Sequence, residues 1–292
     1  MTATAGTAGQ PAAAELGPPP PRKRSWRKVV NKILWYASAV VLALFIAFPL
    51  YLIFIAAIST REEIFSFPKS IIPSGVTFDN IEFFINAGGV IDAFWRSVIV
   101  GIITVLMALA IGAPAGYAIA RYVFRGRSGY RLAVLATRAF PIVILSIPLA
   151  LTFRLIGLAD TVWSVAIMHT ALALPFTVLI TSSVFVSIPK DLEEAAQTLG
   201  CSPWQAFVKI ALPLSLPGLT AAAIFTWVLS WNDVFAASIL TLRNPTLPAH
   251  ILKGLSASPL FFQFAAGFIL IVPSLIVIFV IRKYLLGLWG RV

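Results

Sequence analysis

The chain has 292 residues, of which 59% are hydrophobic and only 11% are charged, and its mean hydropathy is +0.93. Because soluble domains carry about 25% charged residues, this composition excludes an ordinary soluble protein and indicates a membrane protein. The net charge of +11 would suit nucleic-acid binding, but in membrane proteins Lys and Arg usually gather in cytoplasmic loops. A single cysteine, Cys201, excludes an internal disulfide, and two distant histidines, His169 and His250, predict no metal site.

Residues 1–30 are predicted to be a tail that precedes a membrane domain of residues 31–292. The first 21 residues are rich in Ala, Gly, Thr and Pro, a composition that cannot bury a core and predicts disorder. A basic stretch, "RKRSWRKVVNK", follows and leads into 26 uncharged residues, 33–58. The apolar part of a signal peptide has only about 7–15 residues. We therefore expect residues 33–58 to be an uncleaved spanning helix.

Long apolar runs recur along the rest of the chain. A bilayer core of about 30 Å requires roughly 20 apolar residues per helix. By this measure the fold is an all-α membrane protein with six spans, predicted at 33–58, 97–120, 132–153, 162–186, 217–241 and 260–281. Arg138 in the third span is expected to extend toward the nearer membrane surface. Asp233 in the fifth is the only carboxylate inside a predicted span.

The distribution of Lys and Arg gives the expected orientation. If the N-terminus is cytoplasmic, 16 of the 22 Lys and Arg residues fall on the inner side of the six spans. Because cytoplasmic loops are enriched in these residues, both termini are predicted to be cytoplasmic, in the plasma (inner) membrane of a prokaryote. The topology accounts for the positive charge, so no nucleic-acid partner is expected. The segment 187–217, between the fourth and fifth spans, is then cytoplasmic.

This segment is a polar stretch, interrupted by a glycine, within a very apolar chain. Its first part, "DLEEAAQTL", has apolar residues at helical spacing, with three carboxylates in the first turn. Gly200 follows where a left-handed residue ends a helix. The next part, "SPWQ", has the pattern of a capping box with proline at the first helical position. The sequence therefore predicts two short amphipathic helices, with apolar faces formed by Leu192, Ala195, Ala196 and Leu199, and by Trp204, Phe207, Val208 and Ala211.

Helices of about two turns are not stable alone, so both apolar faces need a surface to cover them. One possibility is the inner leaflet or the other helices of the chain. The other is the groove of a partner protein. The acidic first turn favours the partner, because the inner leaflet is negatively charged and repels carboxylates.

The spacing Glu194-Ala195-Ala196, Gly200, Ile210-x-Leu212-Pro213 resembles the EAA loop of ABC importer permeases. In that family the loop is a coupling helix that docks in a cleft of the ATP-hydrolysing subunit. The resemblance implies that Glu194 faces basic groups in the cleft and that Gly200 makes the turn. The residues implied in coupling are Glu193, Glu194, Ala195, Ala196, Gly200, Trp204, Ile210, Leu212 and Pro213.

Three further segments, "GYAIARY", "SWNDVF" and "RKYLLGLWG", are similar to the maltose-type permeases for carbohydrate uptake. The resemblance implies a heteromeric importer for a sugar-type solute: an oligosaccharide, disaccharide, polyol or sugar phosphate. Its partners would be a second homologous permease, two ABC ATPase subunits, an extracytoplasmic solute-binding protein and membrane lipid. Many members end in a tail that reaches the ATPase, whereas this chain ends in "WGRV", so regulation through the tail is not implied.

No G-x-x-x-x-G-K-[ST] motif occurs in the chain, which excludes P-loop binding of a nucleotide. We therefore expect no catalytic residue, no metal and no cofactor on this chain, with ATP and Mg²⁺ bound by the ATPase subunits. No nucleophile–base pair suggests a membrane enzyme.

Asp233, with Trp231 and Asn232, offers a carboxylate, an amide and an aromatic face, which would suit a polyhydroxylated solute in a translocation pathway. The alternative is that Asp233 caps or pairs with a neighbouring helix or with the second permease subunit. A different function is also open, in which Asp233 and His169 carry protons in a secondary transporter, although no internal inverted repeat supports it. An ABC permease for a non-sugar solute is the remaining alternative.

Overall fold

The computed structural model describes residues 26–68, 71–255 and 258–286. Every regular element in these ranges is a helix, and one isolated antiparallel bridge joins Ser59 to Val76. The chain divides into two units, residues 1–51 and residues 52–292, which are described separately. The predicted disordered segment 1–21 lies outside the described residues.

The first unit consists, in its described part, of helix α1 (Trp26–Ile58) as far as Tyr51. Mean hydropathy over this helix is high enough for a membrane span, which agrees with the prediction for residues 33–58. The last turns of α1 belong to the second unit, where Phe54 packs against Phe268 with ring centroids 5.5 Å apart.

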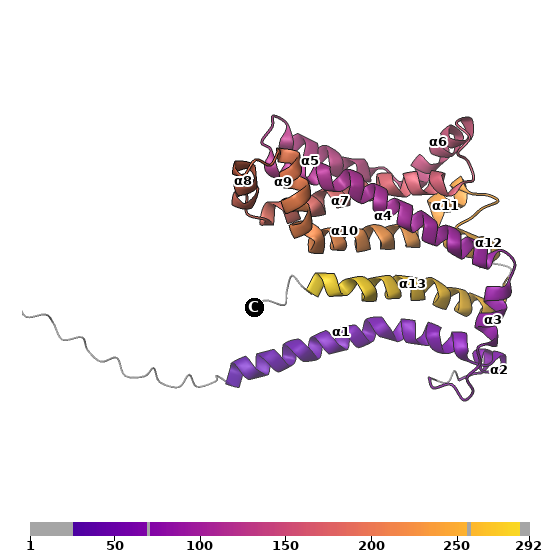
Figure 1. Ribbon diagram of the computed structural model, residues 1–292. Helices are drawn as coiled ribbons and strands as arrows, with labels where there is room; N and C mark the ends of the chain where they lie inside the picture. Colours follow the sequence, from indigo (N-terminus) through magenta and orange to yellow (C-terminus); the bar gives the residue numbers. More distant parts are fainter. Residues whose placement is uncertain (1–25, 69–70, 256–257, 287–292) are drawn as a thin grey trace, which may run out of the picture. The chain divides into compact units, whose positions relative to one another are not determined.

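The second unit contains the remaining helices (Figure 1). Their bounds are α2 (Arg61–Phe65), α3 (Asp79–Asn86), α4 (Val90–Arg121), α5 (Arg127–Ala136), the 3-10 turn η1 (Thr137–Ala139), α6 (Ile142–Leu155), α7 (Val162–Ser187), α8 (Asp191–Thr198), α9 (Pro203–Ala206), the π-helical turn η2 (Phe207–Ala211), α10 (Leu212–Asn232), α11 (Phe235–Leu240), α12 (Leu247–Leu255) and α13 (Leu260–Leu286).

Five stretches of helix are long and apolar enough to cross a membrane: Trp26–Ile58, Val90–Arg121, Val162–Ser187, Pro203–Asn232 and Leu260–Val280. The third predicted span, 132–153, is not one continuous helix. Instead, α5 with η1 and α6 form a pair bent by 87°. Pro141 lies at the bend, where its missing N–H and the restriction on the preceding residue stop the helix.

The prediction of one continuous helix over 217–241 was also wrong. Helix α10 ends at Asn232, and Asp233 has extended backbone angles (φ −73°, ψ 126°). The Asp233 carboxylate accepts a hydrogen bond from the backbone N–H of Ala237 at 3.0 Å. The carboxylate thereby caps the start of α11, so a short polar side chain converts the expected span into two helices.

Small residues allow α4 and α7 to pack closely. Gly112 and Gly116 are buried against α7, and a Cβ atom at Gly112 would lie 2.6 Å from Cγ2 of Thr177. The Thr181 hydroxyl donates to the Gly112 carbonyl at 2.9 Å. The G-x-x-x-G of the sequence therefore serves a helix contact within this chain. Thr177 also contacts α10, where its hydroxyl oxygen lies 3.2 Å from that of Thr226.

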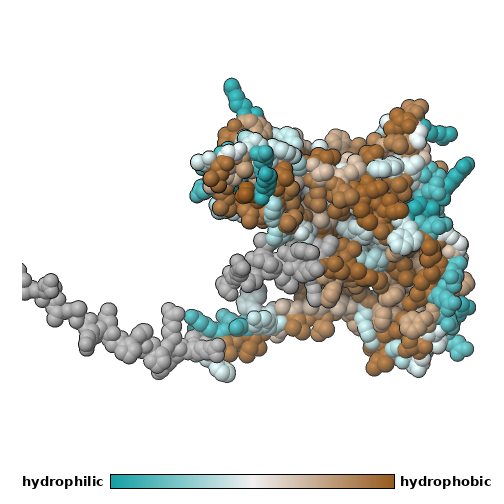
Figure 2. All heavy atoms as spheres, in the orientation of Figure 1, coloured by the Kyte–Doolittle hydropathy of each residue, from teal (hydrophilic) through white to brown (hydrophobic). Residues whose placement is uncertain are grey.

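The two ends of the second unit are formed by different helices. Figure 1 shows α8 and α9 at one end and α11 and α12 at the other. On the face shown in Figure 2, hydrophobic residues cover the middle of the second unit, and hydrophilic residues lie mainly toward its two ends. A bilayer favours this distribution, because uncharged side chains then contact its hydrocarbon core.

Candidate functional site

The α8–α9 hairpin (residues 191–206) has the turn that the sequence predicts. Gly200 has φ +94°, a left-handed conformation that residues with a Cβ rarely adopt. Its backbone N–H donates to the Gln197 carbonyl and closes the helix end. Ser202 and Gln205 form the expected capping box, with side-chain to backbone distances of 3.2 and 2.9 Å.

The second helix of the hairpin is longer than predicted. The sequence predicts a short helix of about two turns, but α9 continues through η2 into α10. The Leu212 N–H donates to the Phe207 carbonyl, five residues back, as in a π-helical turn. Proline at the second position of α10 lacks an N–H, and the wider turn lets the helix continue without it. The hairpin is therefore a direct extension of a membrane helix.

Part of the hairpin packs on the rest of the chain. Phe207 and Ala211 are buried in a cluster with Tyr117 of α4 and Phe185 of α7. The ring centroids of Tyr117 and Phe207 are 4.5 Å apart. These aromatic contacts anchor the base of the hairpin to the ends of two membrane helices.

The outer face of the hairpin remains uncovered in this chain. Leu199 is 87% exposed and Trp204 is 64% exposed, and Leu192 is exposed as well. Of the four residues predicted to form the apolar face of α8, only Ala196 is buried. An isolated chain thus presents leucine and tryptophan side chains at a polar end of the molecule, which is typical of a docking surface.

Glu193 lies on the opposite side of α8 and is buried. Its Oε1 accepts from both Nε (2.8 Å) and Nη2 (2.5 Å) of Arg121, and its Oε2 accepts from the Tyr117 hydroxyl at 2.5 Å. The side chains of Glu193 and Arg121 are only 5% and 7% exposed. Arg121 also donates to the Ile188 carbonyl at 3.0 Å. The prediction grouped Glu193 with the docking residues, whereas this ion pair ties α8 to the end of α4.

The neighbouring Glu194 is exposed, and its carboxylate forms no hydrogen bond or ion pair within the described residues. It is therefore accessible to a partner. The other residues implied in coupling lie around it: Ala195 and Pro213 are exposed, and Ile210 and Leu212 are half-buried.

A buried polar chain joins α7, α10 and α4 near the other end. His169 lies 3.1 Å from Asp233 through Nε2 and Oδ2, and 2.9 Å from Ser230 through Nδ1 and Oγ. The Ser230 hydroxyl lies 3.5 Å from that of Thr104. The fold thus brings together the two titratable residues that the sequence singled out. Oδ2 of Asp233 also accepts from the Ala237 N–H, so this oxygen has two partners within the chain.

Trp231 and Asn232 have different surroundings. Trp231 is 1% exposed, stacks on Trp227 (centroids 5.6 Å apart, 14° between planes) and donates to the Leu270 carbonyl at 2.9 Å. No face of Trp231 is open to a solute in this structure. Asn232 is exposed and donates to the Val228 carbonyl at 2.9 Å.

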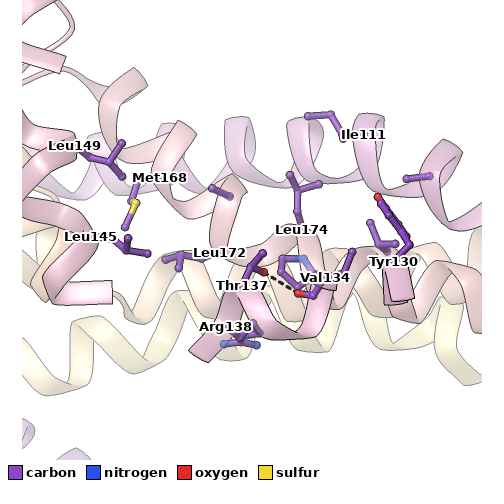
Figure 3. Close-up of a pocket in the computed structure, with 14 residues that line it drawn as sticks. Ile111, Tyr130, Val134, Thr137, Arg138, Leu145, Leu149, Met168, Leu172 and Leu174 are labelled. Atoms are coloured by element: carbon purple, nitrogen blue, oxygen red, sulfur yellow. Dashed lines mark hydrogen bonds between the residues drawn. The ribbon is translucent and has the colours of Figure 1, made fainter. Parts of the chain in front are cut away.

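Sequence reasoning did not identify a cavity at the α5–α6 bend (Figure 3). It has a volume of about 420 Å³ and is lined mostly by apolar side chains of α4, α5, α6 and α7. Its polar lining consists of Tyr130, Thr137 and Arg138. The Arg138 guanidinium lies 3.6 Å from the ring centroid of Phe176, so the arginine is held at the bend instead of extending along a straight helix. The bend itself has no clear sequence signal apart from Pro141.

Within the described residues, no group of three or more His, Cys, Asp or Glu side chains is placed to hold a metal ion. Ser230 lies next to His169, but both side chains are buried.

Residues 108–286 match the family described as "Binding-protein-dependent transport system inner membrane component". This match covers more than half of the chain. The chain belongs to this family. The permease is thus an inner-membrane component of a transport system, and ATP hydrolysis belongs to a separate subunit. Family membership also removes the hypothesis of a proton-coupled secondary transporter.

Two relatives cover most of the permease. The trehalose transport system permease protein SugB of Mycobacterium tuberculosis is 36% identical over 225 residues, which span 75% of this chain and 82% of the relative. The diacetylchitobiose uptake system permease protein DasC of Streptomyces coelicolor is 28% identical over 228 residues, which span 76% and 81%.

The fold is that of a solved transporter. A chain of a bacterial ABC transporter involved in the import of the acidic polysaccharide alginate aligns with a TM-score of 0.71 at 21% identity. The alignment covers 89% of this chain and 98% of the other. The permease therefore has the fold of an ABC importer permease.

Proposed function

We propose that the permease forms half of the translocation pathway of a sugar-importing ABC transporter and is driven through its α8–α9 hairpin by a separate ATPase. The observation that carries the proposal is that the two sides of the hairpin have different surroundings. One side is tied to α4 by the buried Glu193–Arg121 pair, and the other exposes Leu199 and Trp204.

The geometry supports a path for movement from the partner to the membrane. A groove that closes around the exposed side of α8 would pull on Glu193, which holds Arg121 and Tyr117 of α4. The continuous helix from α9 into α10 supplies a second connection. Two packed helices would then move as a unit with the hairpin, as expected for a rigid-body switch between inward- and outward-facing states.

The contacts at the two ends of the bent pair support six crossings. Arg127, at the start of α5, donates to the Ala120 carbonyl at the hairpin end of α4. Beyond α6, Asp160 donates its N–H to the Leu240 carbonyl at the opposite end of the unit. The pair therefore starts at one end and finishes at the other, as a single broken span. With six crossings and the excess of Lys and Arg on the hairpin side, both termini are cytoplasmic.

The partners follow from the family and the proposed coupling. They are a second homologous permease, two ABC ATPase subunits that bind ATP and Mg²⁺, and an extracytoplasmic solute-binding protein. Glu194, exposed on α8, is available to basic groups of the ATPase groove.

A sugar-type solute is supported by the two relatives, a trehalose transport system permease and a diacetylchitobiose uptake system permease. The cavity at the α5–α6 bend is a candidate part of the pathway, because an arginine at this depth normally faces protein or water instead of lipid. Arg138 and Tyr130 can donate hydrogen bonds to sugar hydroxyl oxygens, and the Thr137 hydroxyl, which donates to the Val134 carbonyl at 2.7 Å, can accept one. Exposed Asn232 and the adjacent Asp233 remain candidates for a second contact.

The test is ATP-driven uptake of labelled disaccharides by proteoliposomes that contain the complete transporter and its binding protein. Leu199→Ser and Glu194→Lys should each lower uptake at least tenfold and weaken co-purification of the ATPase, because both alter the exposed docking side. Leu155→Ser is the matched control, since Leu155 is equally exposed, at 87%, but lies on α6 at the other end. Normal uptake by both hairpin variants would rule the docking role out.

A further inference from the structure

The buried contact between His169 and Asp233 lies where the membrane helix that continues the hairpin ends. Helix α10 stops at Asn232, and Asp233 is the residue at its C-terminal boundary. The Oδ2 atom of Asp233 accepts from the Ala237 N–H of α11 at 3.0 Å and lies 3.1 Å from Nε2 of His169 on α7. One carboxylate oxygen thus joins α7, the end of α10 and the start of α11.

The hydrogen bonds on the other side of the histidine ring show how many protons the pair holds. The Thr104 hydroxyl donates to the Val100 carbonyl at 2.7 Å, so its only proton is used. Ser230 therefore donates to Thr104 at 3.5 Å, and the Ser230 oxygen accepts from the Nδ1–H of His169 at 2.9 Å. Since Nδ1 carries one proton, a second proton must lie between Nε2 and Oδ2, where two acceptors would otherwise face each other. The His169–Asp233 pair is therefore neutral overall.

The neutrality of the pair depends on that second proton. Within the described residues, His169 is the only ion-pair partner of Asp233, and the two side chains are 0% and 10% exposed. Helices α10 and α11 contain no other titratable side chain. The titratable residues of the other helices around the pair are Asp92, Arg96, Tyr117 and Arg121 on α4, Arg154 on α6, and His250 and Lys253 on α12. Removal of the proton would leave a net negative charge in a buried site, which is strongly unfavourable.

Removal of the proton also changes the hydrogen bonds. Nε2–H would then donate to the ionised Asp233, and Nδ1 would become an acceptor. Ser230 would have to donate to Nδ1 instead of Thr104, so the contact with α4 would be lost. The proton can exchange with water through Asp233, which is partly exposed next to the exposed Asn232.

We propose that His169 is a positioning residue, and that the proton it shares with Asp233 holds the α10–α11 break against α7 and α4. The inference rests on the proposed function, in which the ATPase moves the hairpin and α10 with it. With the proton in place, movement of α10 reaches α7, α11 and the far end of the unit. Without it, α10 moves while its contact with α4 is broken, and ATP is hydrolysed without import of solute.

The experiment measures the coupling ratio, defined as ATP hydrolysed per solute imported, for the complete transporter in proteoliposomes with its binding protein. The pH runs from about 6 to about 9, the range that spans the titration of a histidine paired with a carboxylate. In the wild type the ratio should rise roughly tenfold with increasing pH, because a hydrogen bond and the neutrality of a buried pair are lost.

Two variants of similar side-chain size remove the shared proton. In His169→Gln and in Asp233→Asn the ratio should not change with pH, because an amide donates a hydrogen bond without titrating. The matched control is His250→Gln, which removes the only other histidine of the chain and should keep the pH profile of the wild type. Unfolding midpoints of all variants are measured at both ends of the pH range.

A wild-type ratio that stays constant over this range, with normal uptake, would overturn the inference alone, and this result needs no variant to fold. A profile in His169→Gln that still rises as in the wild type would overturn it too, even if the unfolding midpoint falls, because His169 would then have a structural role only. Loss of the profile in His250→Gln would assign the titration elsewhere and contradict the proposal. Absence of ATP-driven uptake and of a co-purifying ATPase in the wild type at every pH would instead refute the proposed function.

Discussion

At the residue scale, two adjacent glutamates of α8 have different surroundings, since Glu193 is buried in an ion pair and Glu194 is exposed. The sequence shows Glu193 and Glu194 side by side, and both fit an acidic first turn of a helix. Only the fold reveals that Arg121, 72 residues earlier in the chain, pairs with Glu193. A contact over that separation leaves no local signal, so sequence reasoning could find the hairpin but could not tell its inward side from its outward side.

We predict that Glu193→Ala destabilises the permease by about 3 kcal/mol, because it leaves the buried Arg121 guanidinium without its partner. Glu193→Gln should be milder, since the amide oxygen still accepts from Arg121 and Tyr117. If the pair transmits movement, Glu193→Gln also raises the number of ATP molecules hydrolysed per solute. Thermal unfolding in detergent and coupled transport assays measure the two effects. Equal stability and coupling in both variants would contradict this role of the pair.

Gly200 makes a separate prediction. Nothing lies within 4 Å of a Cβ added at Gly200, so Gly200→Ala costs only backbone strain, about 1 kcal/mol at φ +94°. Gly129, in helix α5, is equally open and has no positive φ. Gly129→Ala should therefore stabilise by roughly 0.5–1 kcal/mol. We expect Gly200→Ala to lower the unfolding midpoint and Gly129→Ala to raise it. If both variants raise it, a Cβ does not strain the turn at Gly200.

At the element scale, the helices were predictable and their breaks were not. Apolar runs of about 20 residues locate the spans because hydrocarbon requires internally bonded backbone. The same runs conceal the 87° bend between α5 and α6 and the end of α10 at Asn232. These breaks depend on a tertiary environment that satisfies the freed backbone groups, as Asp233 does for α11.

Two substitutions of Asp233 can distinguish its two suggested roles. If it serves as a cap and a partner of His169, Asp233→Ala should destabilise by about 1–3 kcal/mol, whereas Asp233→Asn keeps an acceptor for the Ala237 N–H and loses less. If it contacts the solute, both variants should raise KM with unchanged stability. Unfolding midpoints and uptake kinetics, measured on the same preparations, distinguish the outcomes.

At the scale of the whole molecule, composition was enough to predict an all-helical membrane protein with several spans, because the bilayer requires long apolar helices. The cytoplasmic side of the hairpin stays a prediction from the distribution of Lys and Arg. The solute site was not predictable to the same degree. Trp231 appeared suitable for stacking on a sugar, yet it packs between helices and bonds to Leu270. A residue type alone does not indicate whether its face is open.

The orientation can be checked with the one natural cysteine. Cys201 lies in the hairpin turn and is partly exposed. A membrane-impermeant maleimide should label it in inside-out vesicles and not in intact cells. In a Cys201→Ser background, Leu242→Cys at the opposite end should show the reverse pattern, since Leu242 is exposed there. Labelling of both positions from the same side would refute the six-crossing topology.

The central claim is that the exposed side of the α8–α9 hairpin docks on an ATPase subunit. The most direct measurement is crosslinking from Cys201 with a short cysteine-to-amine reagent in native membranes, followed by mass spectrometry of the adduct. The predicted result is a crosslink to an ABC ATPase that disappears in Leu199→Ser/Trp204→Ser and persists in Leu155→Ser. A crosslink unaffected by the hairpin double variant, or adducts only with lipid and the chain itself, would contradict the claim.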